Sequence, residues 1–428
     1  MNIYLDTIGC RLNQSEIEKI GQQFQQAGHQ IIDDPSEADI VVVNTCTVTS
    51  NAASDSRGKI RKAYRAGCQK IIVTGCWSDI DPQAALALPG VHNVVMNKEK
   101  DFLVRDLLSL PPQVFDTMNA DMSLIRHPLP GKLQRTRAFI KAQDGCDNFC
   151  TFCLTRVARG KSRSMPLSKI LRDIHIAEQG DVKEVVLTGV HLASWGQEFS
   201  PPTSINHLVA KILNQSRIPR LRLSSLEPWD LNEAFFQLFE NPRLCQHLHL
   251  PLQSGSEKTL QRMARKITPD EYHRLLRWAR NAAPKIALTT DIIVGFPGES
   301  EEDFEESLSF VQEMNFAGGH VFSFSPRVGT PAMNYDQQLT NHVKKERNAE
   351  MRAVLTTSEY TYHQQFLDQA VSVLWESAKM EGNHWKLSGL TQNYLRVNTS
   401  ANENRWNQID QVHLKSLNQG SFFGEITP

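Results

Sequence analysis

The first hundred residues alternate short apolar runs with longer amphipathic stretches. The apolar runs IYLDT, DIVVVNT and KIIVTG are separated by the helical pattern QSEIEKIGQQFQQAG and by a polar stretch that ends at Gly67. Apolar runs that alternate with helical patterns are typical of βαβ units, in which neighbouring strands are parallel. The pattern therefore predicts an open parallel α/β domain over residues 1–110.

A longer series of the same kind begins at residue 132. Its strand-like segments are AFIKAQ, VKEVVLTGV, PRLRLSSLEP, QHLHLPLQSG, ALTTDIIVGFPGE and GGHVFSFSP. Between them lie helical stretches such as EEDFEESLSFVQEM, which places Phe304, Leu308 and Val311 on one face. Six such units predict a partial (β/α)6 barrel over 132–363. The preceding segment, 111–131, has prolines at both ends and no consistent period, and is predicted to be a linker.

The last part of the chain has a different pattern. A charged helical stretch, KKERNAEMRAVLTTSEYTYHQQFLDQ, is followed by the short segments VSVLWES, HWKLSGL, YLRVNT, QVHLKSL and SFFGEIT. This spacing predicts a small all-β barrel over 364–428. Its aromatic residues Trp375, Trp385, Tyr394 and Trp406 either stack on nucleic-acid bases or form the core of the barrel.

Composition narrows the class of protein. The chain has 428 residues, of which 40% are hydrophobic and 22% are charged, and its net charge is -1. A single core stops growing at about 250 to 300 residues, so several domains are expected. The chain has no acidic or basic tail that would indicate a binding partner. Any nucleic-acid site must therefore be a local patch of the surface. The start, MNIYLDTIGC, lacks an export signal, and no run of about 18 apolar residues is present, so we expect a cytoplasmic protein without membrane association.

Three of the eight cysteines lie close together in GCDNFCTFC, directly after the first predicted barrel strand. Cys146, Cys150 and Cys153 are separated by offsets of four and three. Parallel barrels place their chemistry at the carboxyl ends of the strands. Iron–sulfur cubanes are normally held by four thiolates, so three thiolates leave one iron open to a substrate or cofactor. The alternative is a zinc site or a set of core thiols.

Three further cysteines end the predicted strands of the first domain. Cys10 follows the first run, Cys46 ends DIVVVNTC and Cys76 ends KIIVTGC. Because open parallel sheets bind ligands at the carboxyl ends of their strands, these thiols can converge at one crevice. The alternative is that they are buried thiols of the core. Cys68 and Cys245 are interpreted as core or surface thiols.

These motifs resemble a known family. The CxxxCxxC spacing followed by a series of parallel strands resembles the radical S-adenosylmethionine (SAM) superfamily. TIGCRLNQSE, NTCTVT and TGC resemble the methylthiotransferases, and RLSSLEP, HLHLPLQSGS and DIIVGFPGES are most similar to the MtaB-type branch, which acts on N6-threonylcarbamoyladenosine in tRNA. The terminal barrel resembles the TRAM module, which binds RNA.

The resemblance implies two 4Fe-4S clusters. One cluster is held by Cys146, Cys150 and Cys153 and binds SAM at its open iron, and an auxiliary cluster is held by the trio Cys10, Cys46 and Cys76. The implied reaction adds a methylthio group to C2 of the modified adenine next to the anticodon. One SAM supplies the methyl group, and a second supplies the 5′-deoxyadenosyl radical that removes the hydrogen.

The implied partners are the tRNA substrate, a flavodoxin- or ferredoxin-like reductant and a sulfur donor. Within the family, the target is alternatively isopentenyladenosine in tRNA or an aspartate of a ribosomal protein. An alternative from a different class is a non-catalytic iron–sulfur or zinc protein that only binds RNA.

The resemblance also implies contacts to SAM. The turn at Thr188 and Gly189 stands where the family has a GGE-like turn for the amino group, although the second glycine and the glutamate are missing here. Ser225 and Glu227 are expected to bond the ribose hydroxyls. Glycines lack a Cβ, so the backbone at Gly295 and Gly298 is expected to approach the adenine closely.

A basic stretch flanks Cys146, Cys150 and Cys153. Between Arg126 and Arg163 there are nine Lys or Arg residues and two Asp residues. Such a belt predicts contacts with RNA phosphates and binding that depends on salt. The candidates are Arg126, Lys132, Arg135, Arg137, Arg156, Arg159, Lys161 and Arg163. The alternative is a solvated loop with interdomain ion pairs.

Overall fold

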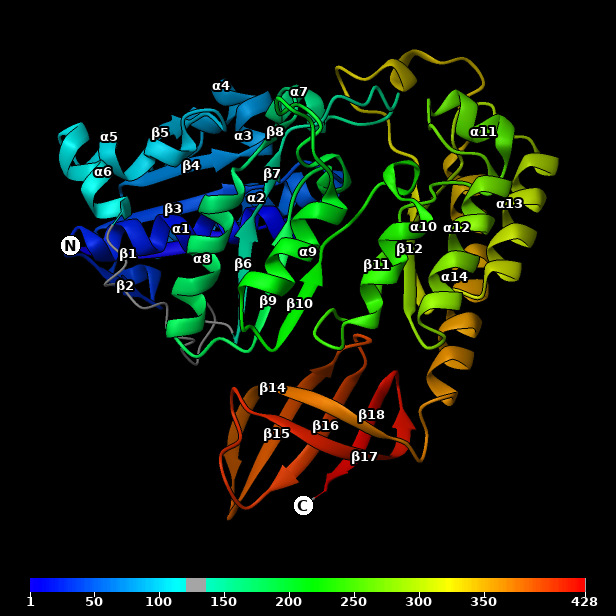
Figure 1. The fold of residues 1–428 in the computed structure, drawn as a ribbon. Coiled ribbons are helices and arrows are strands. Elements are labelled where there is room, and N and C mark those ends of the chain that lie inside the picture. The colour runs from blue at the N-terminus through cyan, green and yellow to red at the C-terminus, as the bar shows by residue number, and fades with distance from the viewer. Residues whose placement is uncertain (121–135, 428) are drawn as a thin grey trace.

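The computed structural model describes residues 1–120 and 136–427, which form three parts (Figure 1). A parallel α/β sheet comes first, two parallel sheets form a central barrel, and a five-stranded closed barrel ends the chain. The predicted fold class is confirmed. No helix in the described part of the chain has the length and apolar character needed to cross a membrane.

The first sheet has five parallel strands in the order β2-β1-β3-β4-β5. The strands are Asn2–Thr7 (β1), Gln30–Ile32 (β2), Ile40–Thr45 (β3), Ile71–Gly75 (β4) and Val91–Val95 (β5). The three apolar runs of the sequence form β1, β3 and β4, and every residue of β3 and β4 is buried. The pattern missed β2, which has three residues, and β5, which is partly exposed.

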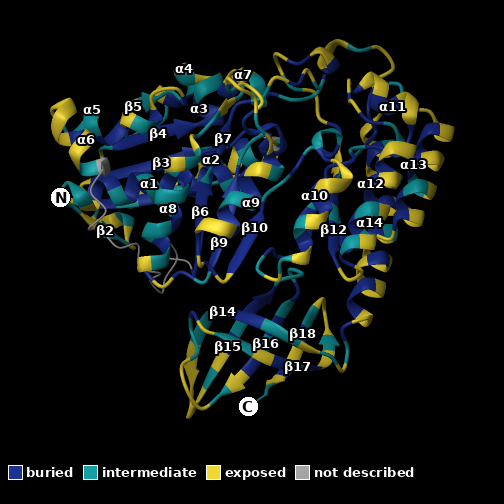
Figure 2. Ribbon diagram, in the orientation of Figure 1, coloured by how far each residue is buried: buried dark blue, intermediate teal, exposed yellow. Residues whose placement is uncertain are grey.

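Helices cover both faces of this sheet (Figure 2). They are Arg11–Gln26 (α1), Ser50–Arg65 (α2), Cys76–Ile80 (α3), Pro82–Leu86 (α4), Leu103–Leu107 (α5) and Pro112–Ala120 (α6). Helix α6 lies within the segment that was predicted to be a linker, and its Phe115 packs into the core beside α1. The rest of that segment lies outside the described residues.

The six predicted barrel strands are confirmed. They are Arg137–Lys141 (β6), Glu184–Thr188 (β9), Arg220–Leu223 (β10), His247–His249 (β11), Ala287–Val294 (β12) and Gly318–Ser323 (β13). They form two parallel sheets, β10-β9-β6 and β11-β12-β13, joined where Leu221 bridges Leu244. Two short antiparallel strands, Gln143–Asp144 (β7) and Arg163–Ser164 (β8), pair at the base of the cysteine loop. All six strands point their carboxyl ends the same way.

Most helices of the central part pack outside these strands, whereas the first of them lies beside the first sheet's helix α3 (Figure 2). They are Thr155–Arg159 (α7), Leu167–Gln179 (α8), Ile205–Gln215 (α9), Glu233–Gln237 (α10), Glu257–Arg262 (α11), Pro269–Ala282 (α12), Glu301–Met314 (α13) and Asn341–Gln364 (α14). Helix α14 is the charged stretch predicted before the terminal barrel, and it packs along β13.

The terminal barrel closes in the order β14-β15-β16-β18-β17. Its strands are Ala370–Glu381 (β14), His384–Thr391 (β15), Arg396–Ala401 (β16), Ile409–Asn418 (β17) and Ser421–Ile426 (β18). It docks under the amino ends of the central strands (Figure 1), where Arg220 and Arg222 donate to the carbonyl oxygens of Leu390 and Thr391. Trp375 is fully buried, and Tyr394 stacks on His247 with ring centroids 4.7 Å apart. The alternative of a barrel core is therefore correct for Trp375, whereas Tyr394 is half-buried against the central part and lies outside the core of the barrel.

Candidate active site between the two cysteine trios

The structure brings Cys10, Cys46 and Cys76 together at the carboxyl edge of the first sheet. Cys10 caps α1 after β1, Cys46 follows β3, and Cys76 begins α3 directly after β4. A Cβ on Gly9, whose φ is +111°, would lie 2.8 Å from the Cys46 sulfur. The pKa of Cys46 is raised to about 11, first by burial and then by the charges of the Cys76 and Cys10 thiolates. All three thiols thus lie at one edge of the sheet, near enough for the charge of one to act on another.

A buried polar network lies beneath this trio. The Nε of Arg159 donates to the Cys76 sulfur at 3.3 Å, and the same guanidinium bonds Glu16, Asp144 and Asn13 at 2.8, 3.0 and 2.7 Å. Burial alone would raise the pKa of Glu16. The nearby cations, Arg159 first, hold that pKa well below its usual value instead. The network therefore contains an ionised carboxylate and a guanidinium directly under a thiol.

Cys146, Cys150 and Cys153 lie in the loop between β7 and α7. The Cys146 amide donates to the carbonyl of Gly160 at 3.1 Å, and the Cys153 amide donates to that of Cys150 at 3.1 Å. The Thr151 amide donates to the carbonyl of Met263 at 3.1 Å, which ties the loop to the end of α11. The backbone thus folds the second trio into one compact turn.

Two basic side chains that the sequence patterns did not reveal approach these thiols. Arg265 lies 3.9 Å from the Cys150 sulfur and pairs with Glu227 at 2.8 Å. The Nδ1 of His191 lies 4.0 Å from the Cys146 sulfur, and its Nε2 lies 2.6 Å from Asp230. Burial lowers the pKa of His191, but the bonds to Asp230 and Cys146 outweigh this and raise it to about 9. His191 follows β9 in the chain. Its position just after a predicted barrel strand was the one sequence feature that could have identified it as a site residue.

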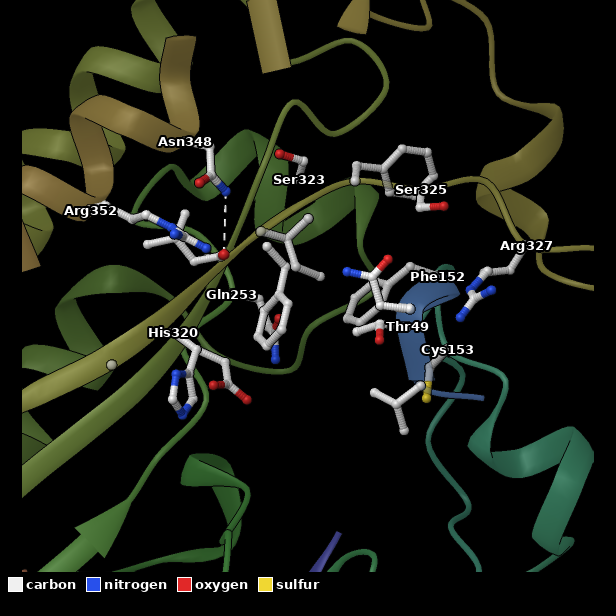
Figure 3. Close-up of a pocket in the computed structure, with 18 of the residues that line it drawn as sticks. Thr49, Phe152, Cys153, Gln253, His320, Ser323, Ser325, Arg327, Asn348 and Arg352 are labelled. Atoms are coloured by element: carbon white, nitrogen blue, oxygen red, sulfur yellow. Dashed lines mark hydrogen bonds between the residues drawn. The ribbon is translucent and has the colours of Figure 1, made fainter. Parts of the chain in front are cut away.

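A cavity of about 830 Å³ is lined by one cysteine of each trio. Cys76 lines it from the first sheet and Cys153 from the second trio, together with Phe152. Asn348 and Arg352, one turn apart on α14, line the opposite side (Figure 3). One space therefore adjoins a thiol of each trio and the guanidinium of Arg352.

The residues expected to contact SAM lie at the carboxyl ends of the barrel strands, in different settings. The Thr188 hydroxyl donates to the carbonyl of Ile140 and is buried. Ser225 lines a second cavity inside the barrel, and Glu227 is paired with Arg265 beside Cys150.

Gly295 and Gly298 lie in one turn after β12, and neighbouring atoms leave little room for a side chain there or at Gly189. Gly295 and Gly298 have φ values of +71° and +75°, and a Cβ on Gly298 would collide with the guanidinium of Arg262. A Cβ on Gly189 would lie 3.1 Å from the side chain of Gln143.

Two of the residues predicted to contact RNA are buried, and for these two the prediction is wrong. The Arg137 side chain is 8% exposed and pairs with Glu376 at 2.7 Å, and the Arg159 side chain is 1% exposed in the network described above. The alternative of interdomain ion pairs is the correct one for both.

The other predicted RNA contacts divide into two groups. Lys161 and Arg163 are exposed, and Arg156 lies over the ring of the exposed Phe149, 3.5 Å from its centroid. Arg126, Lys132 and Arg135 lie outside the described residues.

The two cysteine trios are better suited to binding an iron–sulfur cluster than to binding a single metal ion. Within residues 1–120 and 136–427, no group of three or more His, Cys, Asp or Glu side chains is arranged to hold one metal ion. The irons of a cubane occupy separate corners, so thiolates that bind it need not converge on one point. Each trio offers three soft sulfur ligands, which is the donor chemistry that iron–sulfur clusters require.

Comparisons with known proteins agree with this arrangement. Residues 140–311 match the model of the radical SAM superfamily, and residues 2–97 match that of uncharacterized protein family UPF0004. The threonylcarbamoyladenosine tRNA methylthiotransferase MtaB of Bacillus subtilis is 33% identical over 98% of this chain and 94% of its own. The tRNA-2-methylthio-N(6)-dimethylallyladenosine synthase of Clostridium tetani is 30% identical over 99% of this chain and 95% of its own.

A solved structure shares the fold. The radical SAM methyltransferase TsrM of Kitasatospora setae superposes with a TM-score of 0.57 at 15% identity, over 78% of this chain and 77% of that one. This similarity concerns the fold alone. The two family matches and the full-length relatives show the class of enzyme, for which the radical SAM family implies SAM and 4Fe-4S as cofactors. The chain belongs to the radical SAM methylthiotransferase family.

Proposed function

We propose that this enzyme adds a methylthio group to C2 of N6-threonylcarbamoyladenosine next to the anticodon of tRNA. The observation that carries the proposal is the single cavity lined by Cys76 of one trio and Cys153 of the other. A sulfur-insertion reaction needs the sulfur and the SAM cofactor to reach the same substrate atom. A space adjoining both trios meets that need.

The two trios have separate roles in this proposal. Cys146, Cys150 and Cys153 hold the cluster that binds SAM, and the trio Cys10, Cys46 and Cys76 holds the auxiliary cluster. When bound, these cofactors supply the methyl group, the sulfur and the radical that removes the C2 hydrogen. The chain itself orients the substrate and keeps water away from the site, because the cofactors carry the difficult chemistry.

Neighbouring residues position the SAM end of the site. Arg265 and His191 lie next to the thiols of Cys150 and Cys146, and their partners Glu227 and Asp230 hold them in place. The glycine turns at 295 and 298 and the polar group at Ser225 remain our proposed contacts for the cofactor. Side chains fixed in this way maintain the geometry of a site.

The surface beside the second trio is the proposed entry for tRNA. Arg156, Lys161 and Arg163 supply positive charge there, and the Phe149 ring is 69% exposed under the Arg156 guanidinium. Exposed aromatic rings and arginine planes stack on unpaired bases, which an anticodon loop provides. Binding to these cations is expected to weaken as salt rises.

The far wall of the cavity favours the threonylcarbamoyl substrate over the dimethylallyl one. Arg352 forms no hydrogen bond or ion pair with another described residue, and it lines the cavity one turn from Asn348. A threonyl group carries a carboxylate, which an arginine binds with two parallel hydrogen bonds. A dimethylallyl group is a hydrocarbon and would leave the Arg352 guanidinium without a partner in the complex.

Replacing Arg352 with glutamine is expected to lower kcat/KM on a threonylcarbamoyl-modified anticodon stem-loop about 10- to 100-fold. A hydrogen bond to a charged group contributes about 1.5–3 kcal/mol. Formation of 5′-deoxyadenosine without RNA should be unchanged. Lys345→Gln is the matched control, because Lys345 is an exposed cation on α14 that does not line the cavity. Equal activity of the Arg352→Gln variant and wild type would contradict the assignment.

Nucleoside mass spectrometry of tRNA from a deletion strain tests the substrate directly. We expect 2-methylthio-threonylcarbamoyladenosine to disappear and its precursor to accumulate, with recovery when the gene is restored. Unchanged 2-methylthio-threonylcarbamoyladenosine, or loss of the 2-methylthio-isopentenyl nucleoside instead, would overturn the proposed substrate.

A further inference from the structure

Arg159 belongs to the loop of one cysteine trio but touches the other. Helix α7, which ends at Arg159, begins two residues after Cys153, and the next residue, Gly160, accepts a hydrogen bond from the Cys146 amide. The Arg159 side chain crosses to the first sheet, where its Nε donates to the Cys76 sulfur at 3.3 Å. This side chain therefore links the two proposed cluster sites physically.

The guanidinium is held in one orientation. Glu16 accepts from it at 2.8 and 3.2 Å, Asp144 at 3.0 Å and Asn13 at 2.7 Å, and its side chain is 1% exposed. The planar fork of arginine is fixed by such a set of acceptors. Because water is excluded, its positive charge acts on the adjacent sulfur with little screening.

We propose that Arg159 sets the reduction potential of the iron–sulfur cluster held by Cys10, Cys46 and Cys76. A cluster on three thiolates is negatively charged and gains further negative charge on reduction. A buried cation and an N–H···S contact stabilise the reduced form more than the oxidised form, so they raise the potential. Arg159 acts here as a positioning residue, and the inference rests on the auxiliary cluster of the proposed function.

Removal of the guanidinium leaves its carboxylate neighbours paired. Glu16 still has Lys100 at 2.7 Å, and Asp144 still has Lys141 at 3.6 Å. An Arg159→Met variant is therefore expected to fold. Arg159→Lys keeps the positive charge but loses the planar guanidinium with its several N–H donors. Arg163→Met is the matched control, because Arg163 lies 3.8 Å from the same Asp144 carboxylate but is 50% exposed.

The test is a redox titration followed by electron paramagnetic resonance. It uses the full chain with Cys146, Cys150 and Cys153 replaced by alanine, so that only the auxiliary cluster contributes. Arg159→Met is expected to lower the ratio of reduced to oxidised cluster at fixed potential about tenfold, which is about 59 mV for one electron. Arg159→Lys should fall between this variant and the parent, and Arg163→Met should match the parent.

Iron and sulfide analysis distinguishes a failure of the proposed auxiliary cluster from a failure of the proposed role of Arg159. A parent that holds no iron overturns the auxiliary cluster and this inference with it. A loaded cluster whose potential is unchanged in Arg159→Met, or shifts equally in Arg163→Met, overturns the inference alone. Should Arg159→Met hold no cluster, Arg159→Lys decides: a potential below the parent supports the role of Arg159, and an unchanged one overturns it.

Discussion

Replacing Cys76 with alanine is expected to abolish methylthiolation while leaving SAM cleavage intact. Cys76 lines the cavity and is the thiol that Arg159 contacts, but it belongs to the trio on the first sheet. Its loss removes one of three ligands from the auxiliary site, while the loop of Cys146, Cys150 and Cys153 keeps all of its backbone contacts. Two products are measured in one anaerobic sample that contains dithionite and SAM. The methylthio nucleoside reports methylthiolation, and 5′-deoxyadenosine reports SAM cleavage.

Cys68→Ala is the control for this experiment. Cys68 is buried like Cys46 and Cys76, at 3% exposure, but its sulfur faces the carbonyl of Lys70. We expect this variant to keep both activities. Cys150→Ala should lose both, because it removes a ligand of the SAM site. Methylthiolation that survives in Cys76→Ala would contradict the assignment of the first trio.

Replacing Glu184 with alanine is expected to lower the free energy of unfolding by about 3–5 kcal/mol, because it leaves buried cations without their partner. Glu184 is fully buried, and Arg222 bonds it at 2.7 Å while Arg220 and Arg137 lie 3.8 and 3.9 Å away. The same arginines bond the terminal barrel, so its docking should loosen as well. Urea unfolding measures the first effect, and hydrogen exchange in β14 and β15 measures the second.

The pH dependence of this effect has a defined sign. Burial alone would raise the pKa of Glu184, but Arg222 and then Arg137 and Arg220 lower it to about 2. Its usual value is about 4.3. The stabilisation is therefore fully present above about pH 4.3 and is lost as pH falls toward about 2. The difference in stability between wild type and Glu184→Gln should narrow over that range only.

Glu233→Gln provides the comparison for Glu184. Glu233 is an exposed carboxylate at the start of α10, and exposed substitutions usually change stability by less than about 0.5 kcal/mol. Equal stability of Glu184→Ala and Glu233→Gln would show that the buried cluster of charges contributes nothing net.

The sequence predicted the parts of the site that follow from hydrophobic periodicity. The runs that form β1, β3 and β4 are short and apolar, and each of the first three predicted ligands follows one of them. Parallel strands bring their carboxyl ends to one edge, so the convergence of Cys10, Cys46 and Cys76 followed from the topology alone. The same argument placed Cys146 after the first barrel strand.

Long-range partners were not predictable in this way. Arg159 was assigned to RNA because it lies in a basic stretch, yet its partner Glu16 is 143 residues away. Arg137 pairs with Glu376 of the terminal barrel. A charge in a basic stretch has the same local sequence signal whether it faces solvent or a buried acceptor, and only the packing of domains distinguishes the two.

The most direct test of the account is the iron and acid-labile sulfide content of three anaerobically reconstituted proteins. Wild type should bind about eight irons, and the triple alanine variants of each trio should bind about four, with spectra that add up to that of wild type. The variant lacking Cys10, Cys46 and Cys76 should still cleave SAM. Unchanged iron in either variant, or tetrahedral zinc in place of iron, would contradict two separate clusters.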